Sequence, residues 1–143
     1  MVRKWMILGA SMTFCTTLLA GFSMADDDDS PLHKLMEKVG KQNNAIKKSI
    51  RTEVAYKKAI SDGSLVKVTD ELIKLGKESR AFTEPAEKEK KTQEEWTKLV
   101  DDFVAKTEKF KGVIGKGDAA AAKDSVKGIN ASCTSCHDVF KKE

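Results

Sequence analysis

The residues best suited to chemistry lie close to the end of the chain, where Cys133, Cys136 and His137 form a C-x-x-C-H motif. Three kinds of site could use them: a covalent haem attachment site, a redox-active dithiol, or half of a zinc site. In the first, the two thiols would form thioethers with the haem vinyl groups, and the adjacent imidazole would bind the iron. The elements that position the motif discriminate between the three.

The second and third kinds of site fit the position of the motif less well. A redox dithiol is typical of the start of a helix that follows a strand, where the helix dipole lowers the thiol pKa. Here the motif lies near the C-terminal end of a predicted helix, which a disulfide across three residues would distort. A zinc site would need two more Cys or His ligands, and His33 is the remaining candidate. We therefore interpret the motif as a haem attachment site.

The first 25 residues are typical of an export signal. Arg3 and Lys4 precede an apolar run, and Ser-Met-Ala before Asp26 has the pattern of a cleavage site. An uncleaved anchor is the alternative, since about 18 apolar residues could span a bilayer. We expect residues 1–25 to be a cleaved signal peptide, residues 26–143 to form one domain, and the mature protein to be periplasmic without a membrane anchor. Export agrees with haem attachment, which follows translocation.

The charge balance gives no indication of a nucleic-acid partner. The whole chain has a formal net charge of +4, and removal of Arg3 and Lys4 leaves 24 basic and 22 acidic residues, a net charge of +2. The lysines are scattered along predicted helices, which is typical of solvated helix faces.

Four segments carry apolar residues at the three-four spacing of amphipathic helices. They cover residues 32–50, 65–79, 96–114 and 119–140, with turn signals at 61–64, 81–85 and 112–118. No run alternates long enough to indicate a strand. The sequence therefore predicts an all-α protein, an antiparallel up-down-up-down four-helix bundle with covalently bound haem.

Local signals place the ends of these helices and the motif within them. Asp118 is a candidate N-cap for the last helix and Thr83 for the third. Nothing between Gly40 and Gly63 breaks the first helix, which could extend as far as Ile60. The two cysteines continue the apolar stripe of the last helix, so whatever they hold is expected inside the bundle.

The stretch GDAAAAKDSVKGINASCTSCHDVFKK resembles the last helix of the cytochrome c′ superfamily, the class II cytochromes c. The likeness extends over most of the mature chain, including a tryptophan-containing third helix and Gly-Asp before the haem helix. The resemblance implies a four-helix bundle with one haem c, in which Cys133 and Cys136 bind the haem covalently and His137 is the proximal iron ligand.

The family divides by the residue that the first helix presents to the iron. LMEKVGK is similar to the methionine-ligand stretch of the six-coordinate branch, which makes Met36 the distal ligand and brings Gly40 near the porphyrin edge. A core role for Met36 and ligation by His33 are the alternatives. Members often carry an arginine four residues before the distal residue. Here Leu32 occupies that position, and Lys141 is a candidate partner for the haem propionates.

Two functions follow from this resemblance. The first is a non-enzymatic electron carrier, which passes single electrons between redox partner proteins through a haem ligated by His137 and Met36. The alternative is a pentacoordinate protein that binds a gas such as NO or CO. A thiol oxidoreductase would apply only if the mature chain carried no covalent haem. Similar bundles also form dimers, so a homodimer is left open.

Overall fold

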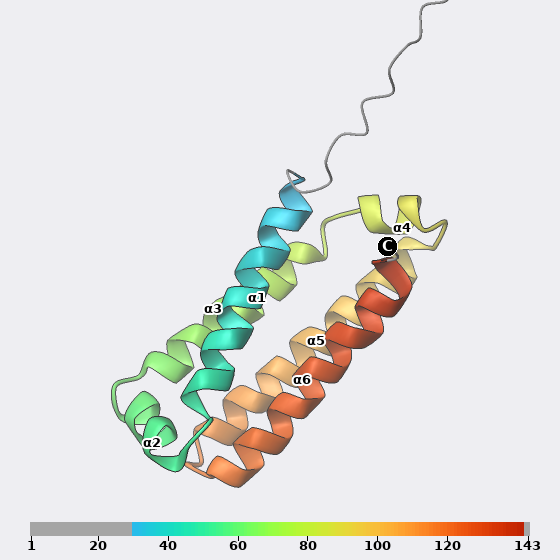
Figure 1. Ribbon diagram of the computed structural model, residues 1–143. Coiled ribbons are helices and arrows are strands. Elements are labelled where there is room, and N and C mark those ends of the chain that lie inside the picture. The colour runs from blue at the N-terminus through green and yellow to red at the C-terminus, as the bar shows by residue number, and fades with distance from the viewer. Residues whose placement is uncertain (1–29, 142–143) are drawn as a thin grey trace, which may run out of the picture.

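The computed structural model describes residues 30–141, which form six helices and no strand. The helices are α1 (Pro31–Ser49), α2 (Glu53–Ser61), α3 (Ser64–Ser79), α4 (Glu84–Lys88), α5 (Gln93–Ile114) and α6 (Ala119–Phe140). The long helices α1, α3, α5 and α6 alternate in direction and pack as a bundle (Figure 1). The predicted antiparallel four-helix bundle is confirmed. The predicted signal peptide, residues 1–25, lies outside the described residues, and no described helix is long and apolar enough to span a membrane.

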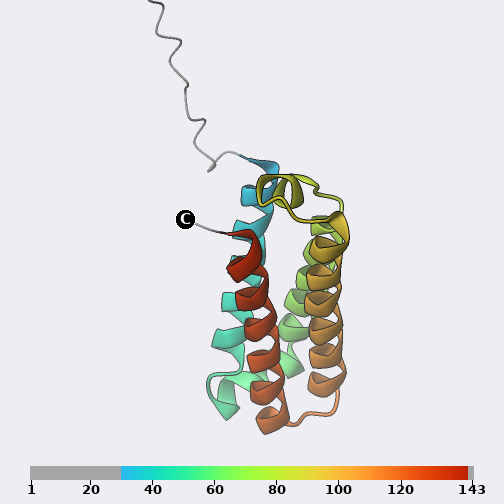
Figure 2. The same ribbon diagram turned by 90° about the vertical axis from the view of Figure 1, so that its right-hand side faces the viewer.

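The two short helices lie at opposite ends of the bundle. α2 joins α1 to α3 at one end, and α4 lies at the other end, where α1 begins and α6 finishes (Figures 1 and 2). The expectation that the first helix could extend to Ile60 was wrong, because α1 ends at Ser49. Thr52 is extended there, and its side chain accepts a hydrogen bond from the N–H of Ala55 at 3.1 Å. This N-cap starts a new helix without glycine or proline.

The starts of the last two long helices show one correct and one wrong prediction. Asp118 caps α6 as predicted, because its carboxylate accepts hydrogen bonds from the N–H groups of Ala120 and Ala121. Thr83 does not cap the third long helix; it precedes the short α4 and makes no side-chain cap bond. α5 instead begins after Thr92, which forms a capping box with Glu95.

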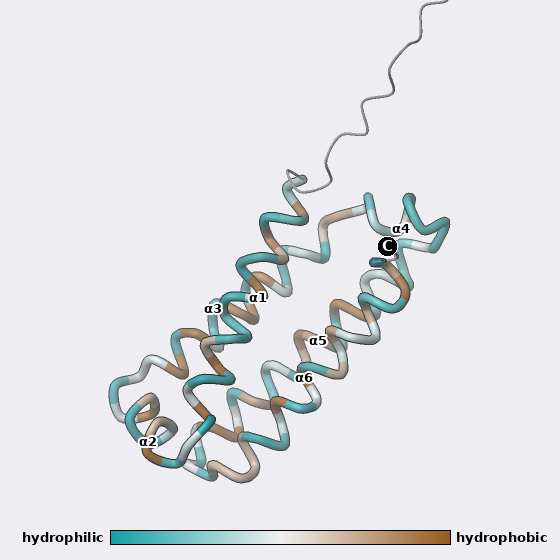
Figure 3. Tube along the Cα trace, viewed as in Figure 1, coloured by the Kyte–Doolittle hydropathy of each residue, from teal (hydrophilic) through white to brown (hydrophobic). Residues whose placement is uncertain are grey.

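The apolar stripes of the long helices face one another and form the core (Figure 3). α3 and α5 approach especially closely at Gly76. A Cβ atom there would lie 2.9 Å from Phe103 Cε1 and 2.9 Å from Val104 Cγ2. Glycine is therefore the residue that this close helix contact requires.

α1 and α6 are held less tightly than the other neighbouring helices. α1 packs on α3, α3 on α5 and α5 on α6, whereas the α1 and α6 backbones come close at few positions. A hydrogen bond from Asn43 Nδ2 to Asn130 Oδ1 at 3.1 Å joins the two helices. Nearer the end where α1 begins, the space between them opens into a cavity.

Candidate functional site

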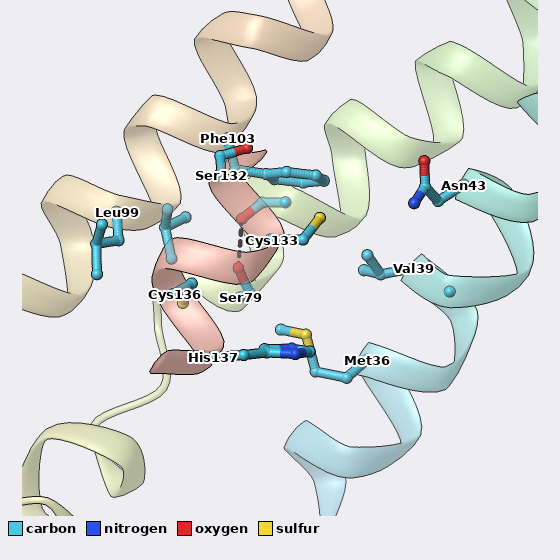
Figure 4. A pocket seen from close by; sticks show the side chains of 13 residues that line it. Met36, Val39, Asn43, Ser79, Leu99, Phe103, Ser132, Cys133, Cys136 and His137 are labelled. Atoms are coloured by element: carbon cyan, nitrogen blue, oxygen red, sulfur yellow. Dashed lines mark hydrogen bonds between the residues drawn. The ribbon is translucent and has the colours of Figure 1, made fainter. Parts of the chain in front are cut away.

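The bundle contains a cavity of about 200 Å³ between α1 and α6. Its walls are mostly apolar and come from all four long helices (Figure 4). The lining residues are Met36, Val39, Gly40 and Asn43 of α1; Gly76 and Ser79 of α3; Leu99, Val100 and Phe103 of α5; and Ser132, Cys133, Cys136 and His137 of α6. The cavity thus contains the residues that the sequence predicts as thioether and iron ligands, whose roles stay predictions.

The C-x-x-C-H motif lies in the last two turns of α6. Cys133 and Cys136 are free thiols, partly buried, and separated by one helical turn, so both line the same cavity. His137 follows at the rim and is exposed on one side. Two thiols and one imidazole therefore border a single, mostly apolar space.

The end of α6 is fixed by aromatic packing beside the motif. The rings of Trp96 and Phe140 meet edge to face with centroids 5.2 Å apart. The indole N–H of Trp96 donates to the carbonyl oxygen of Ser79 at 3.0 Å. α6 is thereby tied to both α5 and α3, which holds the motif against the cavity.

The electrostatics of the thiols do not suit a redox-active dithiol. Burial, reinforced by the neighbouring Cys133, raises the pKa of Cys136 to about 11. Burial also raises the pKa of Cys133, although the positive charge of Lys47 partly opposes this. Reactive dithiols require the opposite change, a lowered thiol pKa.

The structure offers no complete zinc site around these residues either. Among residues 30–141, no group of three or more His, Cys, Asp or Glu side chains could hold a metal ion on its own. His33, the remaining histidine, is not among the residues that line this cavity. Within the described residues, the two thiols and the imidazole therefore do not complete a zinc site.

The environment of His137 keeps its ring neutral. Burial and the positive charge of Lys141 lower the pKa of His137, and the nearby Asp138 opposes them less strongly. A neutral imidazole keeps a free nitrogen lone pair at neutral pH, and this is the form that binds metals.

A second, more open cavity of about 580 Å³ adjoins the first at the end where α1 begins. Met36 and His137 line both cavities, whereas His33 and Lys141 line the outer one alone. In Figure 4, the Met36 thioether and the His137 ring extend into the same space from different helices. Met36 therefore lies between the two cavities, and His33 lies farther from the thiols.

Gly40 lies beside space that protein atoms do not fill, and Asn43 adds a buried polar atom to the cavity wall. A Cβ atom added at Gly40 would meet no atom within 4 Å, so it would project into open space. Asn43 Oδ1 is buried without a hydrogen-bond partner. The hydroxyls of Ser79 and Ser132 instead donate to backbone carbonyl oxygens of their own helices, which leaves the cavity surface predominantly apolar.

The residues present therefore fit a haem. The thiols would bond to the two vinyl groups, the neutral imidazole and the thioether would bind the iron, and the apolar walls would contact the porphyrin. The sequence did not identify Asn43, Gly76 or Ser79 as residues of the cavity. Only Asn43 carried a usable signal, a polar residue on the face of α1 that also holds Met36.

Comparison with known proteins gives one result that agrees with this geometry. No curated protein and no solved structure matched the chain. The family described as Cytochrome C′ matches residues 32–141, which includes every residue of the cavity. Membership of a cytochrome family implies a haem. The chain belongs to the cytochrome c′ family.

Proposed function

We propose that this protein is a c-type cytochrome that carries single electrons through a haem ligated by His137 and Met36 and bonded covalently to Cys133 and Cys136. The observation that carries the proposal is the position of Met36, whose thioether lines the same cavity as both thiols and the imidazole. A thioether in that position suits a closed, six-coordinate site.

Each side chain has a distinct task in this proposal. When bound, haem supplies a one-electron iron couple. Cys133 and Cys136 keep it attached at a fixed position on α6, and His137 presents a neutral ring nitrogen. Met36 would supply the second protein ligand to the iron and exclude exogenous ligands. Val39, Leu99, Val100 and Phe103 exclude water from the remainder of the cavity.

The proposal extends to the setting in which the protein works. The basic and apolar pattern at the start of the chain supports export to the periplasm. An outer-sphere carrier does not transform a substrate, so we propose that its partners are other redox proteins and that it is not itself an enzyme.

Gas binding by a pentacoordinate site is the second candidate. Two observations favour it: the family match is described as Cytochrome C′, and the outer cavity gives access to Met36 and His137. In this alternative Met36 would be a wall residue, and a small molecule would occupy the side that it faces.

Absorption spectra of protein expressed in a periplasm competent for haem attachment separate the two candidates. For the electron carrier, the ferric form is low-spin, and carbon monoxide binds the ferrous form slowly because it must displace Met36. Met36→Ala then gives a high-spin spectrum and rapid binding, whereas His33→Ala changes nothing. A wild-type protein that is already high-spin, with little effect of Met36→Ala, would favour gas binding instead.

A further inference from the structure

Positive charge is concentrated on the second half of α1 and the turn that follows it. Residues 38–51 contain five basic residues and no acidic one, whereas residues 52–141 contain 17 basic and 16 acidic residues. All five are exposed, but Lys38 lies nine residues from Lys47, which places it on the opposite side of α1. The basic face, as we name it, consists of the other four: Lys41, Lys47, Lys48 and Arg51. The scattered lysines that the sequence suggested are therefore balanced by acids elsewhere but not here.

Ion pairing shows the same contrast. α3 and α5 are linked by Lys77–Glu108 at 2.9 Å, Arg80–Asp101 at 3.2 Å and Lys111–Asp70 at 2.6 Å. Within residues 30–141, no member of the basic face forms an ion pair. Its charges are consequently available to a partner.

The basic face borders the cavity. Lys47 lies one helical turn after Asn43, which lines the cavity, so these two residues share one side of α1. Lys41 follows Gly40 directly and therefore lies about 100° farther round the helix. The charge of Lys47 reaches Cys133, since it opposes the effect of burial on the pKa of that thiol. Lys47 therefore lies beside the α1–α6 side of the bundle, where the helices are least tightly packed, and Lys41 and Lys48 continue the basic face onto the outer surface of α1.

The acidic run at positions 26–29 is badly placed to cover this surface. At a rise of 1.5 Å per residue, Lys47 lies about 25 Å along α1 from Ser30. Four fully extended residues span at most about 14 Å. Lys47, Lys48 and Arg51 thus lie beyond these four residues, and an acidic surface from another molecule would be needed to cover them.

We propose that the basic face is the docking surface for a redox partner protein whose own electron-exchange region is acidic. The proposal rests on the proposed electron-carrier function. Complementary charges steer two proteins into an encounter and raise the association rate at low salt. Docking at the basic face would bring the partner against the side of the bundle that holds the cavity.

The first test needs no electron transfer, so it remains valid even if the carrier function fails. Poly-L-glutamate is titrated into the protein as purified, at low salt, and backbone amide NMR shifts are followed. Chemical-shift changes are expected at residues 38–51 of α1 and the following turn, and at the residues of α6 that face α1 across the cavity. They should disappear in Lys41→Glu/Lys47→Glu and persist in the control Lys67→Glu/Lys109→Glu, which changes two exposed, unpaired lysines of α3 and α5. Changes spread over the whole surface, equal loss in both variants, or tighter binding of single-stranded DNA would overturn the proposal.

The second test measures electron transfer. One electron passes from the reduced protein to hexacyanoferrate(III), which becomes hexacyanoferrate(II). At low salt, Lys41→Glu/Lys47→Glu should lower the rate constant of this reaction on the order of tenfold. The control Lys67→Glu/Lys109→Glu should lower the same rate constant less than about threefold. The difference should vanish in 1 M salt, where the Debye length is about 3 Å. Equal slowing by both variants would show an effect of net charge and overturn the proposal.

Discussion

Substitution of Gly40 by alanine tests directly whether a large group fills the α1–α6 cavity. In the structure a Cβ atom at Gly40 meets nothing within 4 Å, and one at Gly128 of α6 meets only Lys106 Cδ at 3.9 Å. Both glycines lie inside long helices. Protein contacts alone therefore predict that alanine raises the free energy of unfolding by nearly the same amount at the two positions.

That benefit is the helix propensity of alanine over glycine, about 0.8–1.0 kcal/mol. Gly128→Ala should raise the free energy of unfolding by about this amount. If a haem occupies the space beside Gly40, the new methyl group overpacks it, at a cost of about 1–3 kcal/mol. The haem-loaded Gly40→Ala protein should therefore be less stable than Gly128→Ala by about 1–3 kcal/mol.

Urea unfolding followed by far-ultraviolet circular dichroism measures both values, because thioether bonds would keep the haem on the unfolded chain. Gly76→Ala is the internal standard for overpacking, since its Cβ would lie 2.9 Å from Phe103 and Val104 side-chain atoms. Equal stabilisation by Gly40→Ala and Gly128→Ala in haem-loaded protein would show that nothing lies against Gly40, and the reasoning would be refuted.

Three further predictions concern stability and thiol chemistry. Cys133→Ala together with Cys136→Ala should prevent covalent attachment of the haem and leave the cavity of about 200 Å³ unfilled. At roughly 24 cal/mol per Å³, the free energy of unfolding measured in urea should fall by about 5 kcal/mol relative to the haem-loaded wild-type protein. A decrease below about 1 kcal/mol would contradict this prediction. In haem-free wild-type chain, the raised pKa of Cys136, about 11, should make alkylation at pH 8 roughly 20-fold slower than in the urea-unfolded chain, after allowing for the greater nucleophilicity of a more basic thiolate. The alkylation rate should rise as the pH approaches that pKa, and a fast, pH-independent reaction would argue against the burial of this thiol. Thr92→Ala should lower the free energy of unfolding by about 1 kcal/mol, because the capping box is lost. Thr83→Ala should leave it nearly unchanged, and urea unfolding of both variants beside the wild-type protein measures the difference.

The sequence predicted the parts of the fold that depend on helix periodicity. The stripes at residues 32–50, 65–79, 96–114 and 119–140 correspond to α1, α3, α5 and α6. The errors concerned helix boundaries that are not marked by glycine or proline at the cap itself. α1 ends at Ser49, and Thr52 starts a new helix through a side-chain cap. Thr92 rather than Thr83 caps α5, because the short α4 precedes it. Such caps are weak signals, since threonine is common in many other contexts.

The site was predictable where it has a motif and unpredictable where it has only shape. Cys133, Cys136 and His137 are recognisable by spacing, and Met36 was matched through a short similar stretch. Gly76 and Val100 line the same cavity, but in the sequence they are ordinary positions on helices with an apolar stripe. Whether a residue on an apolar stripe faces a neighbouring helix or a cavity depends on the distance between the helices. That distance is set by side-chain packing across the whole bundle, and no short stretch of sequence reveals it.

The intact mass of the protein, purified from a periplasm competent for haem attachment and measured under denaturing conditions, tests the central claim most directly. We predict the mass of residues 26–143 plus one haem, retained after acidic organic extraction. The Cys133→Ala/Cys136→Ala variant should have the mass of the polypeptide alone. An unmodified wild-type chain from the same host would contradict covalent attachment at these two cysteines, and with it the proposed function.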